Sequence, residues 1–169
     1  GARVGLHPRI MSATTGDGRA DIVGFGNDGV WVSRAQADGT FAAPVLVLNN
    51  FGYSAGGWRV NMPPRFMADT TGSGRADIVG FGNAGVWVSR AQADGTYTAP
   101  VLVVNNFGYS AGGWRVDMHP RFMADTTGDG RADIVGFGNP GVLGSRAPPS
   151  GTYPAPVLVV GNFGYSDRR

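Results

Sequence analysis

A 56-residue repeat constrains this chain more than any other feature of its sequence. The phrase TTGDGRADIVGFGN at 14–27 recurs almost unchanged at 70–83 and 126–139, so that the 169 residues hold three units and one residue more. Repeats this long and this similar indicate an array of one supersecondary unit. We therefore expect a single repeat domain with units at 1–56, 57–112 and 113–169.

Within each unit, short runs of β-branched and aromatic residues are bounded by Gly, Asn, Asp and Pro. In the middle unit these runs lie at 58–62, 76–81, 86–90 and 100–104. Such runs are typical of strands joined by tight turns, and the connections are too short for a crossover helix. The chain also has 29 Gly and 11 Pro and contains neither Lys nor Glu, which excludes a helical bundle.

Four antiparallel strands repeated in tandem predict an all-β fold, namely a β-propeller with three four-stranded blades. A β-solenoid is the less favoured alternative, because its coils are usually shorter. Propellers close with roughly four to eight blades, so three blades are too few for a ring. We expect a homo-oligomer, in which a head-to-tail dimer completes a ring of six blades. The alternative is that the chain is a fragment of a longer propeller.

Charge and hydrophobicity narrow the range of partners. The net charge is +2, and the 14 arginines stand singly rather than in a basic stripe, so nucleic acid is not an expected partner. No apolar run approaches the ~18 residues of a membrane span. The absence of cysteine excludes disulfides and thiolate metal sites. We expect a soluble protein, and the sequence leaves open whether it is secreted or cytoplasmic.

The acidic loop that opens the repeated phrase is a candidate metal site. In the third unit, carboxylates stand at positions 1, 5 and 9 of the loop, with a glycine at position 6. Oxygen ligands on a tight glycine turn suit Ca²⁺. The alternative is a turn in which Asp accepts hydrogen bonds from backbone N–H groups. The predicted ligands are Asp125, Asp129 and Asp133 in the third unit, where calcium fits best, and Asp69 and Asp77 in the second.

The long link between units, NNFGYSAGGWRV at 49–60 and again at 105–116, is a second candidate site. A pyranose ring has an apolar face and a rim of hydroxyls, which an aromatic platform with a few directed polar groups would match. Trp58 and Tyr53 are candidates for the platform, and Arg59 or Arg65 for the donor. The backbone at 56–57, two glycines, would allow the sugar to approach closely. The alternative is that aromatic residues of the link simply pack between blades, as we expect for Phe51.

Three further sets of residues recur in the repeat. His7 and His119 precede a Pro-Arg pair, where they could donate to a ligand or simply occupy a surface turn. We expect the arginine of that pair to form an ion pair with Asp, and the tryptophan of the third strand to lie in the blade core. These residues are Arg9, Arg65 and Arg121, and Trp31 and Trp87.

Three phrases together resemble a known family: ADTTGDGRADIVGFG at 124–138, NNFGYSAGGWRV at 105–116 and HPRF at 119–122. They are similar to the Psathyrella velutina lectin family, and the resemblance covers essentially the whole chain. Members are fungal and bacterial β-propeller lectins with an integrin-like fold. The resemblance implies binding of N-acetylglucosamine-type sugars in pockets between adjacent blades, and Ca²⁺ in some of the acidic loops.

Carried over to this chain, the resemblance places one sugar site at each junction between units. The family has more blades than this chain, so the resemblance implies that intact function needs oligomer closure or a further segment. Ala2 stands where the repeat has Trp, which predicts a weaker site at a junction between copies. The implied sugar-binding residues are Tyr53, Gly57, Trp58 and Arg59 at the first junction, and Tyr109, Gly113, Trp114, Arg115 and His119 at the second.

The expected function is therefore multivalent, non-catalytic binding of glycans that carry N-acetylglucosamine. A protein–protein interaction platform, built on the loops of one propeller face, is the main alternative. A glycoside hydrolase is less favoured, because it needs two carboxylates facing each other across the sugar. Here most acids lie in the repeated turn loops, and near-identical units argue against a catalytic site that is built only once.

Overall fold

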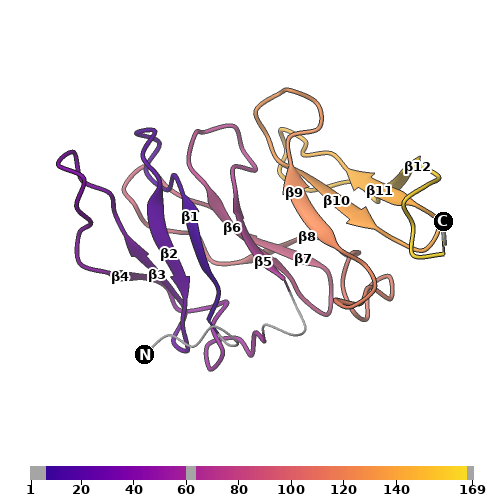
Figure 1. Cartoon of the computed structure of the whole chain (residues 1–169), viewed down its shortest axis with the longest axis horizontal. Coiled ribbons are helices and arrows are strands. Elements are labelled where there is room, and N and C mark those ends of the chain that lie inside the picture. Colours follow the sequence, from indigo (N-terminus) through magenta and orange to yellow (C-terminus); the bar gives the residue numbers. More distant parts are fainter. Residues whose placement is uncertain (1–6, 60–63, 167–169) are drawn as a thin grey trace.

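The computed structural model describes residues 7–59 and 64–166, and their regular structure consists of strands. Twelve strands within these ranges form three separate four-stranded antiparallel sheets (Figure 1), which confirms the predicted blades. The first blade contains β1 (Arg9–Ser12), β2 (Asp21–Phe25), β3 (Val30–Ser33) and β4 (Val45–Leu48). The second contains β5 (Arg65–Ala68), β6 (Asp77–Phe81), β7 (Val86–Ser89) and β8 (Val101–Val104). The third contains β9 (Arg121–Ala124), β10 (Asp133–Phe137), β11 (Val142–Ser145) and β12 (Val157–Val160).

Each blade is a meander in which every strand pairs with the next one along the chain. The first strands of adjacent blades lie beside each other, β1 against β5 and β5 against β9. The last strands, β4, β8 and β12, lie at the far edge of their sheets. A register shift at the start of each third strand, for example between Val86 and Trp87, bends that strand against its outer neighbour. The blades thus stand side by side in chain order (Figure 1).

The predicted position of the first strand was wrong. The alternating run at 58–62 was expected to open the second blade, but that blade begins with β5, after the two prolines. Residues 57–59 have no regular structure, 60–62 lie outside the described residues, and the equivalent residues 116–118 form a turn. The alternation is misleading because the Trp58 side chain packs onto Gly80 of the second blade while its backbone joins no sheet.

The core lies between blades rather than within one of them. Val23 and Phe25 of the first blade pack with Ile78 of the second. Val79 and Phe81 of the second blade pack in the same way with Ile134 of the third. Each blade therefore offers a Val/Phe face to the blade that follows and an Ile face to the blade that precedes, as alternating strand side chains allow.

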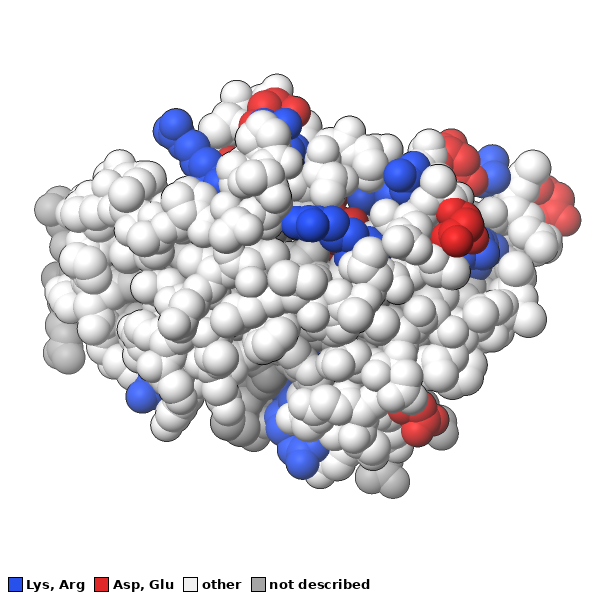
Figure 2. Space-filling model, turned by 180° about the vertical axis from the view of Figure 1, so that it is seen from behind, with Lys and Arg blue, Asp and Glu red and all other residues white. Residues whose placement is uncertain are grey.

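Neither a membrane-spanning helix nor a face of one charge sign is seen in the described part of the chain. No helix within the described part of the chain is long and apolar enough to cross a membrane. Figure 2 shows the charged residues on one face: Arg and Asp gather mainly along one edge with both signs intermixed, and most of that face is uncharged.

Candidate functional site

The link between the first two blades is fixed at its start by an asparagine side chain. The Asn50 Oδ1 accepts hydrogen bonds from the backbone N–H of Phe51 (2.7 Å) and from the Trp58 indole Nε1 (3.3 Å). The first bond stabilises Phe51 at φ 58°, a left-handed conformation that non-glycine residues rarely adopt. The link next rests on the β2–β3 turn, where Asn27 O accepts from Ser54 N and Ala55 N. These contacts define its path from the first blade to the second.

The indole of Trp58 is a packing element that also borders a cavity. It is only 8% exposed, and its ring centroid lies 4.7 Å from that of Phe51, which is fully buried as predicted. Both rings lie over Gly80 of β6. A Cβ atom at that position would come within 2.5 Å of Phe51 Cε1 and 2.6 Å of Trp58 Cζ3. Glycine is therefore required on β6 for the two rings to reach the sheet.

A cavity of about 410 Å³ lies where the link meets the second blade. The link lines it with Asn50, Gly56, Gly57 and Trp58, and the blade with Gly82, Asn83, Ala84, Trp87 and Pro100. Trp87 was predicted to lie in the blade core. It does pack partly against the core, but its indole is half-buried and lines the cavity, so that prediction was only partly right.

The second seam has a smaller cavity, of about 230 Å³, built from the equivalent positions. Two differences between the repeats change its walls: Leu143 stands where the second blade has Trp87, and Pro140 stands where it has Ala84. The lining residues are Asn106, Gly112, Gly113, Trp114, His119, Gly138, Asn139, Pro140 and Leu143.

His119 is buried in this second seam, and so it is not a surface turn residue. Its Nδ1 accepts a hydrogen bond from Arg115 N (3.1 Å), so its Nε2 carries the proton and donates it to Asn139 Oδ1 (2.8 Å). The imidazole also packs edge-on against Trp114 and Tyr165. His7 is likewise buried and bonds Asn27 Oδ1 at 2.9 Å. In both units the histidine engages the side chain of the turn asparagine.

The tyrosines and arginines predicted to bind sugar are not among the residues that line the two cavities. The Arg59 guanidinium stacks on the Tyr53 ring at 3.5 Å, and its Nη1 donates to Tyr53 O. Arg115 stacks on Tyr109 in the same way, at 3.6 Å. Because each guanidinium is held over a ring by a cation–π contact, these four residues stiffen the link on its outer side.

The recurrent arginine of the first strands was expected to pair with Asp, and this prediction was wrong. Arg65 is buried, its Nη1 donates to Phe51 O at 2.7 Å, and its guanidinium lies over the Phe25 ring. Arg121 repeats these contacts with Phe107 O and the Phe81 ring. Burial lowers the pKa of each guanidinium to about 10. The arginines thus tie adjacent blades together through a backbone carbonyl.

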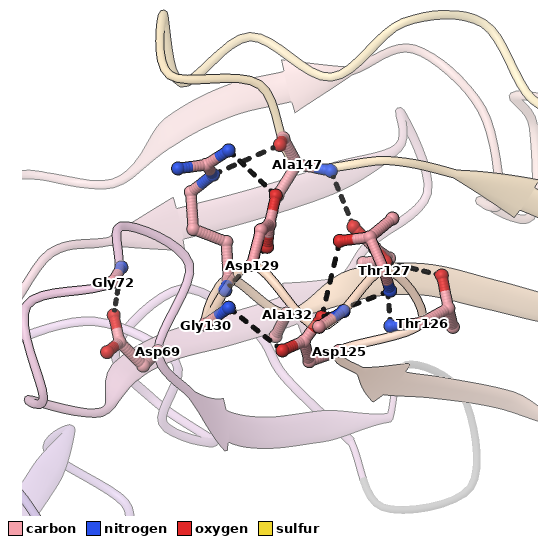
Figure 3. A network of polar contacts seen from close by, with 12 residues as sticks. Asp69, Gly72, Asp125, Thr126, Thr127, Asp129, Gly130, Ala132 and Ala147 are labelled. Carbon is pink, nitrogen blue, oxygen red and sulfur yellow. Dashed lines mark hydrogen bonds and ion pairs between the residues drawn. The ribbon is translucent and has the colours of Figure 1, made fainter.

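The acidic loops bind backbone and hydroxyl groups (Figure 3). In the third unit, Asp125 accepts from Gly128 N (2.7 Å) and Gly130 N (2.9 Å), and the Gly130 bond contributes most to lowering its pKa. Asp129 forms an ion pair with Arg131 at 2.7 Å. The buried carboxylate of Asp133 accepts from Thr126 N and Oγ1, and from Ala147 N next to β11.

The calcium prediction concerns the same carboxylates. Within residues 7–59 and 64–166, no group of three or more acidic or histidine side chains is placed to hold a metal ion. In the second unit, Asp69 accepts from Gly72 N and Gly74 N, while Asp77 is buried and bonded to Thr70. Burial raises the pKa of Asp77 despite that bond. The carboxylates of both loops accept hydrogen bonds from N–H and O–H donors, as the turn interpretation expects, and the calcium site stays a prediction.

A lectin of known sugar specificity is similar to this chain in both sequence and structure. No protein-family model and no curated protein matches the chain. Among solved structures, it is similar to an Agrocybe aegerita lectin that recognises non-reducing terminal N-acetylglucosamine, with 46% identity and a TM-score of 0.93. That match covers 99% of this chain but 42% of the lectin, so the chain spans less than half of its length. The resemblance to a lectin family is confirmed.

A more distant structural similarity extends to the TcdB2–TccC3 assembly. In its complex with Cdc42, the identity is 19% and the TM-score 0.70, over 88% of this chain and 7% of that one. At this level of identity the similarity concerns the fold alone.

Proposed function

We propose that this chain is a non-catalytic carbohydrate-binding protein that holds N-acetylglucosamine-type sugars in the cavities at its blade seams. The observation that carries the proposal is the cavity between the first link and the second blade, where a half-buried indole stands next to backbone and side-chain amides. The similarity to a lectin specific for terminal N-acetylglucosamine supports the same sugar class.

Within this cavity, Trp87 is better suited than Trp58 to stack on the apolar face of a sugar. The Trp58 indole is nearly buried and its Nε1 is bonded to Asn50, whereas the Trp87 indole is partly open to the cavity. Aromatic rings that are partly exposed in a concave wall are the usual platforms for such an amphipathic ligand. Trp58 then acts as the support that holds the link against the second blade.

Asn83 is suited to supply the directed polar contact at the same seam. It is exposed at the cavity edge, and its side chain makes no hydrogen bond to the other described residues. The equivalent Asn27 and Asn139 are each engaged by a histidine, but the second unit has Pro63 at the histidine position. The amide of Asn83 is therefore available for a sugar hydroxyl or acetamido group.

The walls of both seam cavities support binding without catalysis. A glycoside hydrolase needs a pair of carboxylic acids about 5–10 Å apart across the scissile bond. Neither the 410 Å³ cavity nor the 230 Å³ cavity has Asp among its lining residues. Besides indole, amide and backbone groups, the second cavity has the imidazole of His119, whose two ring nitrogens are both engaged by hydrogen bonds. Neither cavity therefore offers the pair of carboxylic acids that glycoside hydrolysis needs.

The test is a calorimetric titration with N-acetylglucosamine of the unmodified chain, Trp87→Ala and Leu143→Ala. Loss of an aromatic contact of about 0.5–1.5 kcal/mol corresponds to a 2- to 12-fold weaker affinity at the first seam. Leu143→Ala, the matched control at the second seam, should leave the first site unchanged. Unaltered titration of a folded Trp87→Ala protein would contradict the stacking role, and no binding by the unmodified chain would contradict the proposed function.

A further inference from the structure

The second seam carries a further hollow, of about 400 Å³, at the outer edge of the two blades. One wall consists of β8 and the start of the link that follows it, and the other of residues of the 152–156 segment, which leads into β12. The second and third blades pack on each other here, so both walls belong to a seam within the chain. We call this space the outer hollow, to distinguish it from the 230 Å³ seam cavity.

Tyr153 holds the two walls of the outer hollow at a fixed separation. Its backbone N–H donates to Val103 O at 3.0 Å, which ties the segment of the third blade to β8. Its ring is 4% exposed, and its hydroxyl donates to Ala132 O at 2.6 Å. A ligand therefore meets a concave surface that is already formed, as in most small-molecule sites.

Two polar side chains that line the outer hollow, Asn105 and Thr152, have no hydrogen-bond partner among the described residues. In the second unit, the hydroxyl of the equivalent Thr96 is bonded to Gln92 and Asp94, at 2.6 Å each. The third unit has proline and serine at those two positions, so the hydroxyl of Thr152 loses both partners. A hydroxyl and a carboxamide are thus available to a ligand at this place.

The remaining side-chain surface of the outer hollow is mostly aliphatic and carries no charge. Leu102 is 37% exposed and Pro156 is half-buried, so both present CH groups to a ligand. Neither the outer hollow nor the seam cavity has Asp or Arg among its lining residues. Apolar walls with a few directed polar groups suit a neutral pyranose better than an anion.

Asn106 joins the outer hollow to the seam cavity, because it lines both. Its Oδ1 accepts from Phe107 N (2.7 Å) and from the Trp114 indole (3.0 Å), whereas its NH₂ group makes no hydrogen bond to the other described residues. At the first seam, a single cavity reaches as far as Pro100, the equivalent of Pro156. The two spaces of the second seam therefore follow the course of one groove.

We infer that the outer hollow is a second subsite, which holds the sugar residue next to a terminal N-acetylglucosamine bound in the seam cavity. The inference rests on the proposed function. The seam cavity of 230 Å³ is smaller than the roughly 300–1,000 Å³ of small-molecule sites, and the outer hollow adds about 400 Å³. The NH₂ group of Asn106 lies where it can donate to the linkage, and Asn105 and Thr152 bind hydroxyls of the second residue. The second seam thus prefers a disaccharide to the monosaccharide.

The test is an NMR titration of the unmodified chain with N-acetylglucosamine and with N,N′-diacetylchitobiose. The indole N–H signal of Trp114 reports on the second seam, and those of Trp58 and Trp87 report on the first. Trp31 is 36% exposed, not in the blade core as predicted, and lines neither cavity, so its signal is the reference. At Trp114, the disaccharide should bind more tightly by about 2- to 12-fold for each neutral hydrogen bond gained in the outer hollow.

Asn105→Ala and Thr152→Val remove the two polar groups separately. Both residues are exposed, so the fold should tolerate either change. Each variant should weaken disaccharide binding at the second seam by about 2- to 12-fold and leave monosaccharide binding there unchanged. Asn49→Ala changes the equivalent position at the first seam and is the matched control, which should not alter the titration at Trp114.

The possible results separate the subsite from the proposed function. Equal affinities for the two sugars at Trp114 would overturn the subsite and leave the proposed function standing. The subsite would also be wrong if the variants weakened both sugars alike, or if the Trp114 signal responded to neither sugar while the first-seam signals did. Only a lack of response from every indole, to both sugars, would contradict the proposed function as well.

Discussion

Gly80 and Gly24 occupy the same position in successive blades but have opposite surroundings. A Cβ at Gly80 would come within 2.6 Å of both Phe51 and Trp58, two buried rings with little room to move. A Cβ at Gly24 would meet nothing within 4 Å. Neither residue has a positive φ, so alanine is not excluded by the backbone at either place.

Comparison of Gly80→Ala with Gly24→Ala therefore isolates the cost of overpacking a seam. Replacing Gly by Ala in a strand should gain about 0.5–1 kcal/mol at both positions, and this gain cancels in the comparison. Forcing a methyl group into a packed core costs about 1–3 kcal/mol. We expect the free energy of unfolding of Gly80→Ala to lie below that of Gly24→Ala by this amount.

Urea denaturation followed by tryptophan fluorescence measures the difference. Both substitutions are made in the otherwise unmodified chain and compared at the same protein concentration. Gly80→Ala should also weaken sugar binding at the first seam, because the displaced Trp58 lines that cavity. Equal stability of the two variants would refute the reasoning, since it would mean that the rings do not need the space above Gly80.

Three further predictions concern carboxyl pKa values, the asparagine that begins each link, and the effect of removing metal ions. Burial raises the pKa of Asp77 above 3.8, while the Thr96 hydroxyl lowers that of Asp94, so carboxyl NMR should place the two on opposite sides of that value. The stabilising contribution of Asp77 is then complete below pH 3.8 and is lost as the pH rises through its raised pKa. Asn106→Ala should cost about 1–3 kcal/mol, because Phe107 N and the Trp114 indole lose their acceptor. Asn162→Ala, where only the first of these bonds is found among the described residues, should cost less in the same denaturation assay. EDTA should leave the thermal midpoint unchanged, and a clear drop would support the calcium prediction.

Much of the candidate site was predictable from the repeat, but not the role of each aromatic residue. The sequence placed the site in the 49–60 link and gave the packing of Phe51 correctly. It predicted a core position for Trp87 and a platform for Trp58, whereas the structure nearly buries Trp58 and opens Trp87 to the cavity. Spacing cannot distinguish two tryptophans, because exposure depends on which residue of the adjacent blade faces each indole.

The first strand illustrates the same limit. The run at 58–62 alternates as a strand would, but nothing local records that Gly80 leaves a groove for the indole. One weak signal was present: glycine recurs inside the apolar run of every second strand, and a glycine there often marks a close approach by another group.

The sequence by itself determined the number of blades, three of the four strands in each, and the position of the links. These properties depend on local patterns: strand periodicity, turn residues and an exact repeat length. Only the tertiary structure decided which blade faces are buried, where the arginines donate, and which residues line the cavities. Those properties arise where two blades meet, and residues 14 to 61 positions apart in the chain are brought together only by the packing of one sheet on the next.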